Sequence, residues 1–303
     1  MADNKKTIAL ALGGGGARGF AHVGVLEVME EHGIKVDYIA GTSMGSVVGA
    51  LYALGMPLKR IKDIAMHFQN IDFSPMEYAT PFHESLLSGD FIDEAMRQLF
   101  GDAKFEDCKI PFSTLAIDLE TGKEVVFNTG LIREVLRASV SIPIIFPPHF
   151  YQDRYLIDGA VLNNVPLSLL VDKKPDVLIG VKLANYTSQQ YISGMVYAKY
   201  QKNKYQDLFK KAGIIENYID QRKRDIKLLI GIALRSLDIA SQDSTNSRIA
   251  DAHPDYVLKP DVLCGHLEFE KSKETIEEGR RCMEEALPDI FKILDEKGIA
   301  YKR

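Results

Sequence analysis

A short run around Ser43 constrains the fold of this chain more than any other feature. Residues 38–50 place the serine between Gly41 and Gly45, after an apolar stretch typical of a strand and before a small-residue stretch typical of a helix. In this G-x-S-x-G arrangement the serine occupies a tight turn, and glycines are needed where strand and helix approach too closely for a β-carbon. The pattern predicts an α/β fold in which the Ser43 hydroxyl lies beside a helix N-terminus, where negative charge is stabilised.

A glycine-rich loop follows the first predicted strand. Residues 7–12 form an apolar strand pattern that runs into four consecutive glycines and then into a helical pattern. Residues 14–19 match G-x-G-x-x-G, a loop that binds dinucleotide phosphates. A dinucleotide site needs an acidic residue at the end of its second strand, whereas Asp37 stands at the start of that strand. The alternative is that the glycine N–H groups converge on one point and stabilise an oxyanion near Ser43.

An aspartate follows another predicted strand. Residues 155–157 predict a short strand that delivers Asp158 and Gly159 to a turn. A carboxylate at a strand end, followed by a glycine, is well placed to face the same edge of the sheet as Ser43. Because Asp-Gly is also an ordinary turn dipeptide, this pattern alone leaves a purely structural role open.

The composition limits the class of protein. The chain has 303 residues, 46% of them hydrophobic, which is enough for a large α/β domain with its own core. Its three cysteines are far apart and match no metal-ligand spacing, so we expect reduced thiols and no metal site. The apolar run at 8–12 is too short for a signal peptide, and no run reaches the roughly 18 residues of a membrane span. We therefore expect a cytoplasmic protein, and the net charge of −5 gives no general attraction to nucleic acid.

The remaining patterns predict one domain over residues 1–303, built from alternating helices and strands. A stretch at 71–88, rich in aromatic and polar residues, is expected to form a loop that can act as a lid. Helices are expected at 58–70, 89–100 and 131–138, and one helix or a pair of helices, interrupted at Pro288, is expected at 273–297. Further strands are expected at 111–118, 123–128, 176–183 and 256–259.

A basic helical insertion is expected at about residues 186–250. Tyrosines are scattered among charged residues there, and residues 199–227 hold nine Lys and Arg against four Asp and Glu. Such a segment suits either a solvated helical cover or contact with an anionic membrane surface. The second interpretation predicts peripheral association with the inner membrane surface.

Together, three motifs in this order resemble those of the patatin-like phospholipase family, particularly its bacterial members related to neuropathy target esterase. The family pattern G-G-G-x-[RK]-G is matched by residues 14–19, G-x-S-x-G by residues 41–45, and D-G-[AG] by residues 158–160. The likeness covers residues 7–183 and, more weakly, 251–284, while the basic insertion departs from the family core. The resemblance implies a three-layer α/β/α fold with a mostly parallel central sheet, and hydrolysis of acyl esters, often in lipids, without a cofactor.

The resemblance also implies a role for each motif residue. Ser43 is the expected nucleophile, which forms an acyl-enzyme, and Asp158 is its general base in a dyad without histidine. Burial would have to raise the pKa of Asp158 from about 4 for this role near neutrality. The expected oxyanion donors are the backbone N–H groups of Gly14, Gly15, Gly16 and Met44. The residues expected to support these loops are Arg18, Gly19, Gly41, Gly45, Gly159 and Ala160, with Arg18 fixing the glycine loop in preference to binding an anionic head group.

Three alternatives stay open at the level of sequence. A Ser-His-Asp triad would use His253 or His266, which both follow Asp158 in the chain order of α/β-hydrolases. A lipid-binding or regulatory module would keep the fold without useful turnover. A dinucleotide-dependent enzyme is disfavoured by the position of Asp37. The acyl hydrolase that the resemblance implies would have an acyl lipid or another ester as its partner.

Overall fold

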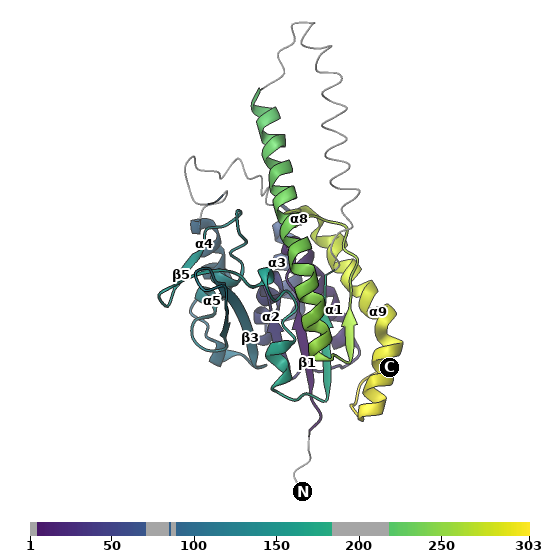
Figure 1. Cartoon of the computed structure of the whole chain (residues 1–303). Coiled ribbons are helices and arrows are strands. Elements are labelled where there is room, and N and C mark those ends of the chain that lie inside the picture. The colour runs from purple at the N-terminus through teal and green to yellow at the C-terminus, as the bar shows by residue number, and fades with distance from the viewer. Residues whose placement is uncertain (1–4, 71–84, 86–88, 184–217) are drawn as a thin grey trace, which may run out of the picture.

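The computed structural model describes residues 5–70, 85, 89–183 and 218–303. It is a mixed α/β fold in which helices cover both faces of an eight-stranded sheet (Figure 1). The predicted three-layer architecture is therefore confirmed. The predicted lid at 71–88, apart from Ser85, and the first half of the predicted insertion lie outside the described residues, so the lid and the membrane contact stay predictions.

Five parallel strands form one part of the sheet, as predicted. They read as continuous apolar runs because helices cover both of their faces. In β1, Leu10 and Leu12 enter the larger core cluster, while Ala9 and Ala11 pack in a second cluster on the opposite face. The strands lie in the spatial order β3 (Phe112–Asp118), β2 (Tyr38–Gly41), β1 (Ile8–Leu12), β7 (Val177–Val181) and β8 (Tyr256–Leu258).

The antiparallel part of the sheet is built around β3. The predicted hairpin of β3 and β4 (Glu124–Phe127) is confirmed, and β5 (His149–Tyr151) pairs with β6 (Arg154–Asp158). Thr114 of β3 pairs with both β2 and β4, and Ala116 pairs with both β4 and β6. Because β4 fills one edge of β3, β2 and β6 share the other edge and meet end to end. The last residue of β6, Asp158, therefore lies close to the end of β2.

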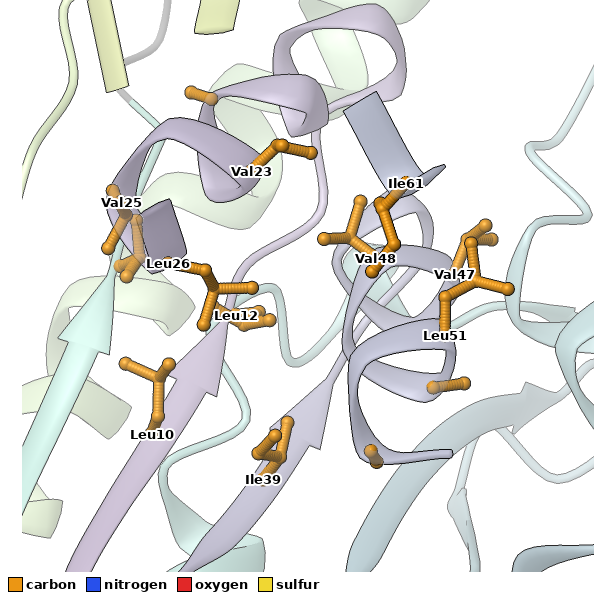
Figure 2. Packing of buried hydrophobic residues seen from close by; sticks show 14 of the residues in the cluster. Leu10, Leu12, Val23, Val25, Leu26, Ile39, Val47, Val48, Leu51 and Ile61 are labelled. Carbon is orange, nitrogen blue, oxygen red and sulfur yellow. The ribbon is translucent and has the colours of Figure 1, made fainter. Parts of the chain in front are cut away.

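The larger core lies between the sheet and a layer of helices that includes α1 (Ala21–Glu31), α2 (Met44–Ala53), α3 (Leu58–His67), α5 (Ile132–Ser139) and α9 (Ser272–Lys297). Leu12 of β1 and Ile39 of β2 project from the sheet into the same cluster as Leu26 of α1 and Val48 of α2 (Figure 2). Helix α4 (Gly89–Phe100), with the predicted bounds, adds Met96 to it.

The opposite face of the sheet is covered by α6 (Ser168–Val171) and α8 (Tyr218–Ala252), which crosses in front of the sheet in Figure 1. Ile249 and Ala252 of α8 pack against the smaller cluster. The second half of the predicted insertion is thus a single long helix between β7 and β8. None of the described helices has the length and apolar character that a membrane crossing requires.

The predicted interruption of the C-terminal helix at Pro288 is wrong. Pro288 was expected to interrupt the C-terminal helix, but α9 is one helix of 26 residues with Pro288 inside it. Tertiary packing holds this helix, because Met283, Ala286 and Ile290 on both sides of the proline are buried in the core. Burial of this apolar face outweighs the local cost of a proline in a helix, about 3 kcal/mol.

Candidate active site

Ser43 occupies a strained turn between β2 and α2. Its backbone angles are φ 53° and ψ −128°, in a region that residues with a side chain rarely adopt. A β-carbon at Gly41 would lie 2.5 Å from the carbonyl oxygen of Gly45, and one at Gly45 would lie 2.3 Å from the carbonyl oxygen of Leu12. Both glycines are therefore required by close backbone approach, which is the arrangement that the G-x-S-x-G pattern predicts.

The hydroxyl of Ser43 meets the carboxyl group of Asp158. Ser43 Oγ donates a hydrogen bond of 2.6 Å to Asp158 Oδ2, while the N–H of Ala160 donates one of 2.8 Å to Oδ1. Both side chains are 3% exposed. Asp158 reaches this position from an antiparallel strand, because β6 ends where β2 stops on the same edge of β3.

The environment of Asp158 changes its acidity. Burial raises its pKa to about 7, although the hydrogen bonds from Ser43 and Ala160 act in the opposite direction. A carboxylate in water is too weak a base to take a proton from a serine near neutral pH. This raised pKa therefore fits a general base that works near pH 7.

The glycine loop offers fewer free donors than the sequence predicted. The N–H of Gly14 is already shared between Asn164 Oδ1, at 2.8 Å, and the carbonyl oxygen of Asn164, at 3.1 Å. Among the described residues, the N–H groups of Gly15, Gly16 and Met44 have no hydrogen-bond partner. The proposed oxyanion donors therefore narrow to these three, and Gly14 becomes a structural position that Asn164 holds.

The supporting motif residues make close contacts around the site. A β-carbon at Gly19 would lie 2.3 Å from Met44 Cγ, and one at Gly159 would lie 2.6 Å from Leu115 Cδ1. Arg18 Nε donates to the carbonyl oxygen of Gly15 at 3.1 Å. This last contact fits the expected role of Arg18 in fixing the loop.

Two polar residues near the site, the buried Ser139 and the half-buried Asn164, escaped the sequence-based reasoning. Ser139, at the end of α5, accepts a hydrogen bond from the N–H of Ser43 at 3.2 Å, and Asn164 holds the glycine loop. Each is distant in sequence from the residue that it contacts. The only local signal was the Asn-Asn-x-Pro run after the Asp158 turn, which is equally typical of an ordinary loop.

The alternatives to a dyad find little support in the geometry. Ser43 Oγ donates to a carboxylate, whereas Nε2 of His266 lies 2.6 Å from Arg18 Nη2. His253 follows the end of α8 and does not line the cavities next to Ser43. Asp37 accepts the N–H of Ile8 at the amino end of β1, the opposite edge of the sheet from the glycine loop and the wrong edge for a dinucleotide.

Two cavities meet at Ser43. The first is apolar and is lined by Val47 and Leu51 of α2, Ile61 and Ile64 of α3, and Ala95 and Leu99 of α4. The second is more polar and is lined by the glycine loop, Asp158, Asn164 and the α8 residues Leu234, Leu237, Asp238 and Ser241. A bound ester could thus place an apolar chain on one side of Ser43 and a polar group on the other. Among the described residues, no group of His, Cys, Asp and Glu side chains could hold a metal ion.

Relatives of the chain were found in several organisms. An uncharacterized NTE family protein of Mycobacterium tuberculosis is 35% identical over 179 residues, covering 58% of this chain and 49% of the relative. Another from the same species is 26% identical over 291 residues, covering 95% of this chain and 48% of the relative. A lysophospholipase of Pyricularia oryzae is 31% identical over 183 residues, covering 59% of this chain and 12% of that protein. The chain thus spans about half the length of the mycobacterial relatives.

A solved structure and a family model were also matched. The solved structure of VipD from Legionella pneumophila has a TM-score of 0.44 and 11% identity, covering 92% of this chain and 67% of that one. The family model described as patatin-like phospholipase matches residues 10–171. This match takes in the glycine loop, the Ser43 turn and the Asp158 turn, and it spans more than half of the chain. The chain therefore belongs to the patatin-like phospholipase family.

Proposed function

We propose that this protein is a serine acyl hydrolase that cleaves carboxylic esters of lipids through an acyl-enzyme. The observation that carries the proposal is the 2.6 Å hydrogen bond from Ser43 Oγ to a buried carboxyl group whose pKa is raised to about 7. The family match supports the same chemistry.

The acylation step uses groups that are already in place. Ser43 Oγ attacks the ester carbonyl carbon while its proton passes to Asp158, and a tetrahedral oxyanion forms. The N–H groups of Gly15, Gly16 and Met44, which have no hydrogen-bond partner among the described residues, supply its hydrogen bonds. Collapse of this intermediate breaks the ester C–O bond, and Asp158 returns the proton to the departing alcohol.

Deacylation repeats the sequence with water. Asp158, again ionised, takes a proton from water, which attacks the acyl carbon and forms a second oxyanion in the same position. Breakdown of that intermediate releases the carboxylic acid, and the proton on Asp158 returns to Ser43. The active site is then restored without any cofactor in the scheme.

The cavities support a lipid ester as the substrate class. The apolar cavity begins at Ser43 and continues between α2, α3 and α4, where it suits an acyl chain. The relative from Pyricularia oryzae is a lysophospholipase, which supports the same substrate class.

Labelling with a fluorophosphonate tests the proposal directly. We expect the probe to modify Ser43, as mapped by mass spectrometry, and we expect Ser43→Ala to abolish both labelling and hydrolysis of an aryl ester with an unchanged fold. Ser236→Ala, at an exposed serine of α8, is the matched control and should keep both. Labelling at another residue, or substantial turnover by Ser43→Ala, would contradict the nucleophile assignment.

Asp158→Asn and His253→Ala, measured together, separate the dyad from a triad that uses His253. Loss of the general base should lower kcat by about 10² to 10⁴-fold. His253→Ala should keep the activity, because His253 lies away from the cavities next to Ser43. Full activity in Asp158→Asn, or its loss in a folded His253→Ala variant, would favour histidine catalysis instead.

A further inference from the structure

A cluster of three charged or titratable side chains, one buried and two half-buried, lies next to the glycine loop and has no part in the proposed chemistry. Arg18 comes from the loop itself, Asp238 from α8, and His266 from the segment that precedes α9. Arg18 is only 3% exposed. A guanidinium buried to this extent needs charged or hydrogen-bonding partners, because an unpaired buried charge is strongly destabilising.

Arg18 controls the orientation of one peptide group. Its Nε donates to the carbonyl oxygen of Gly15 at 3.1 Å. In a planar trans peptide the following N–H points in the opposite direction from that carbonyl, so the same contact fixes the direction of the Gly16 N–H. The Gly16 N–H is one of the three proposed oxyanion donors.

The Gly15–Gly16 peptide needs such a restraint. Rotation of this peptide changes ψ of Gly15 and φ of Gly16, and neither residue has a β-carbon to oppose it. Gly16 sits at φ 58°, and a β-carbon there would lie 2.2 Å from the carbonyl oxygen of His266, so no other residue fits. The conformational freedom that glycine brings must therefore be removed by a contact to the peptide group itself, which Arg18 supplies.

The other end of Arg18 is held by Asp238 and His266. Arg18 Nη2 lies 3.6 Å from Asp238 Oδ2 and 2.6 Å from His266 Nε2. Because a guanidinium can only donate, Nε2 of His266 accepts. Burial and the charge of Arg18 lower the pKa of His266, which keeps the ring neutral. Although burial opposes it, the positive charge of Arg18 lowers the pKa of Asp238, so its carboxylate is charged and balances Arg18.

Helix α8 also docks onto the segments around Asp158. Leu234 packs with Ile145 and Phe146, which follow α5. Ser244 Oγ donates to the carbonyl oxygen of Leu162 at 3.0 Å, in the turn just after Asp158. Contacts on both sides of Asp238 therefore fix where α8 presents this carboxylate.

We propose that Asp238 is a positioning residue of the active site, which acts through Arg18 to hold the Gly16 N–H toward the oxyanion. Hydrolysis would then depend on the docking of α8, and the helix between β7 and β8 would be part of the machinery that assembles the oxyanion hole. This inference rests on the proposed function, since it assigns a role within the same site.

Asp238→Asn tests the inference with almost no change in shape. Removal of one oxyanion donor costs about 10² to 10³-fold in kcat. Partial misorientation of the Gly16 N–H should therefore lower kcat, calculated per active site that the fluorophosphonate labels, by about 10 to 100-fold. KM for a small aryl ester should stay within about twofold, because Asn keeps the shape of the part of the cavity wall that Asp238 forms. Asp238→Glu, which keeps the carboxylate, should recover part of the lost kcat. Asp243→Asn, at an exposed position of α8, is the matched control and should keep the wild-type kcat.

A double-mutant cycle shows whether Asp238 acts through Arg18. If it does, Arg18→Gln combined with Asp238→Asn should be no slower than Arg18→Gln alone. Additive losses would overturn the inference, as would wild-type kcat in Asp238→Asn or a loss confined to thermal stability. Because the fluorophosphonate titrates only active sites of folded protein, kcat is calculated for the folded fraction. Partial misfolding therefore cannot be mistaken for a loss of kcat.

The same measurements separate this inference from the proposed function. If the wild type hydrolyses esters and is labelled at Ser43 while Asp238→Asn has the same kcat, only the role of Asp238 fails. If the wild type is neither labelled nor active on any aryl ester, the proposed function itself fails.

Discussion

At the scale of a single residue, burial gives Asp158 a pKa that suits its proposed role as a base, and it also destabilises the charged form of the carboxyl group. Its pKa of about 7 predicts that kcat/KM for an uncharged ester rises with pH and levels off above about pH 7 to 8. The ionised carboxylate is the form that accepts the proton of Ser43, and below pH 7 it becomes progressively protonated. A pH profile from 5 to 9 measures this. Activity that stays constant down to pH 5 would contradict the assignment.

The same shift predicts how stability depends on pH. The folded-state pKa of about 7 lies above the ordinary value of 3.8, so the folded state binds the proton more tightly. This contribution to stability is fully present below pH 3.8, declines as the pH rises, and is lost above about pH 7. Asp158→Asn has no buried group that must ionise as the pH rises. The Tm of this variant, relative to that of the wild type, should therefore increase between pH 4 and 7.5 and stay constant above that range. Thermal unfolding at several pH values measures the difference, and a pH-independent difference would show that the buried carboxyl group is not shifted.

The decisive contact at the scale of secondary-structure elements is the crossing of α1 and α9. A β-carbon at Gly279 of α9 would lie 1.9 Å from the carbonyl oxygen of Ala21, and one at Gly24 of α1 would lie 2.1 Å from that of Ile276. The two helix backbones therefore touch, and α9 covers the helix that begins directly after the glycine loop.

Gly279→Ala should separate these helices. Overpacking of this kind costs about 1 to 3 kcal/mol, so we expect the free energy of unfolding in urea to fall by at least that amount. Gly180→Ala in β7 is the matched control, because its nearest contact would be an ordinary 3.4 Å. Equal effects of the two substitutions would mean that the backbone contact at Gly279 contributes nothing specific.

At the scale of the whole molecule, helices α2, α3 and α4 enclose an apolar cavity that begins at Ser43. Ala95→Phe in α4 should shorten it and lower kcat/KM for long-chain aryl esters at least tenfold more than for the acetate. Each buried methylene of the acyl chain contributes about 0.8 kcal/mol, so exposure of two or three methylenes accounts for the tenfold difference in kcat/KM. Ala240→Phe, at an exposed position of α8, is the control. An unchanged chain-length preference would show that the acyl chain lies elsewhere.

Local sequence patterns anticipated many of the elements for a physical reason that is itself local. The run Ile-Ala-Leu-Ala-Leu in β1 and the glycines around Ser43 specify a buried strand and a tight turn through the chain's own sterics. The hairpin of β3 and β4 likewise follows from a short turn between two apolar runs. The error at Pro288 arose because the rule for proline describes an isolated helix, whereas burial of α9 offsets that cost.

By itself the sequence determined the α/β fold, the turn that carries Ser43, and the prediction that Asp158 shares its edge of the sheet. Only the tertiary structure decided that Asp158 arrives on an antiparallel strand, that Asn164 occupies the Gly14 N–H, and that Asp238 reaches Arg18 from α8. The physical reason is the range of the interactions. Steric limits on backbone angles act between neighbouring residues, whereas burial, pKa and the choice of hydrogen-bond partner depend on groups that meet only when the chain has folded.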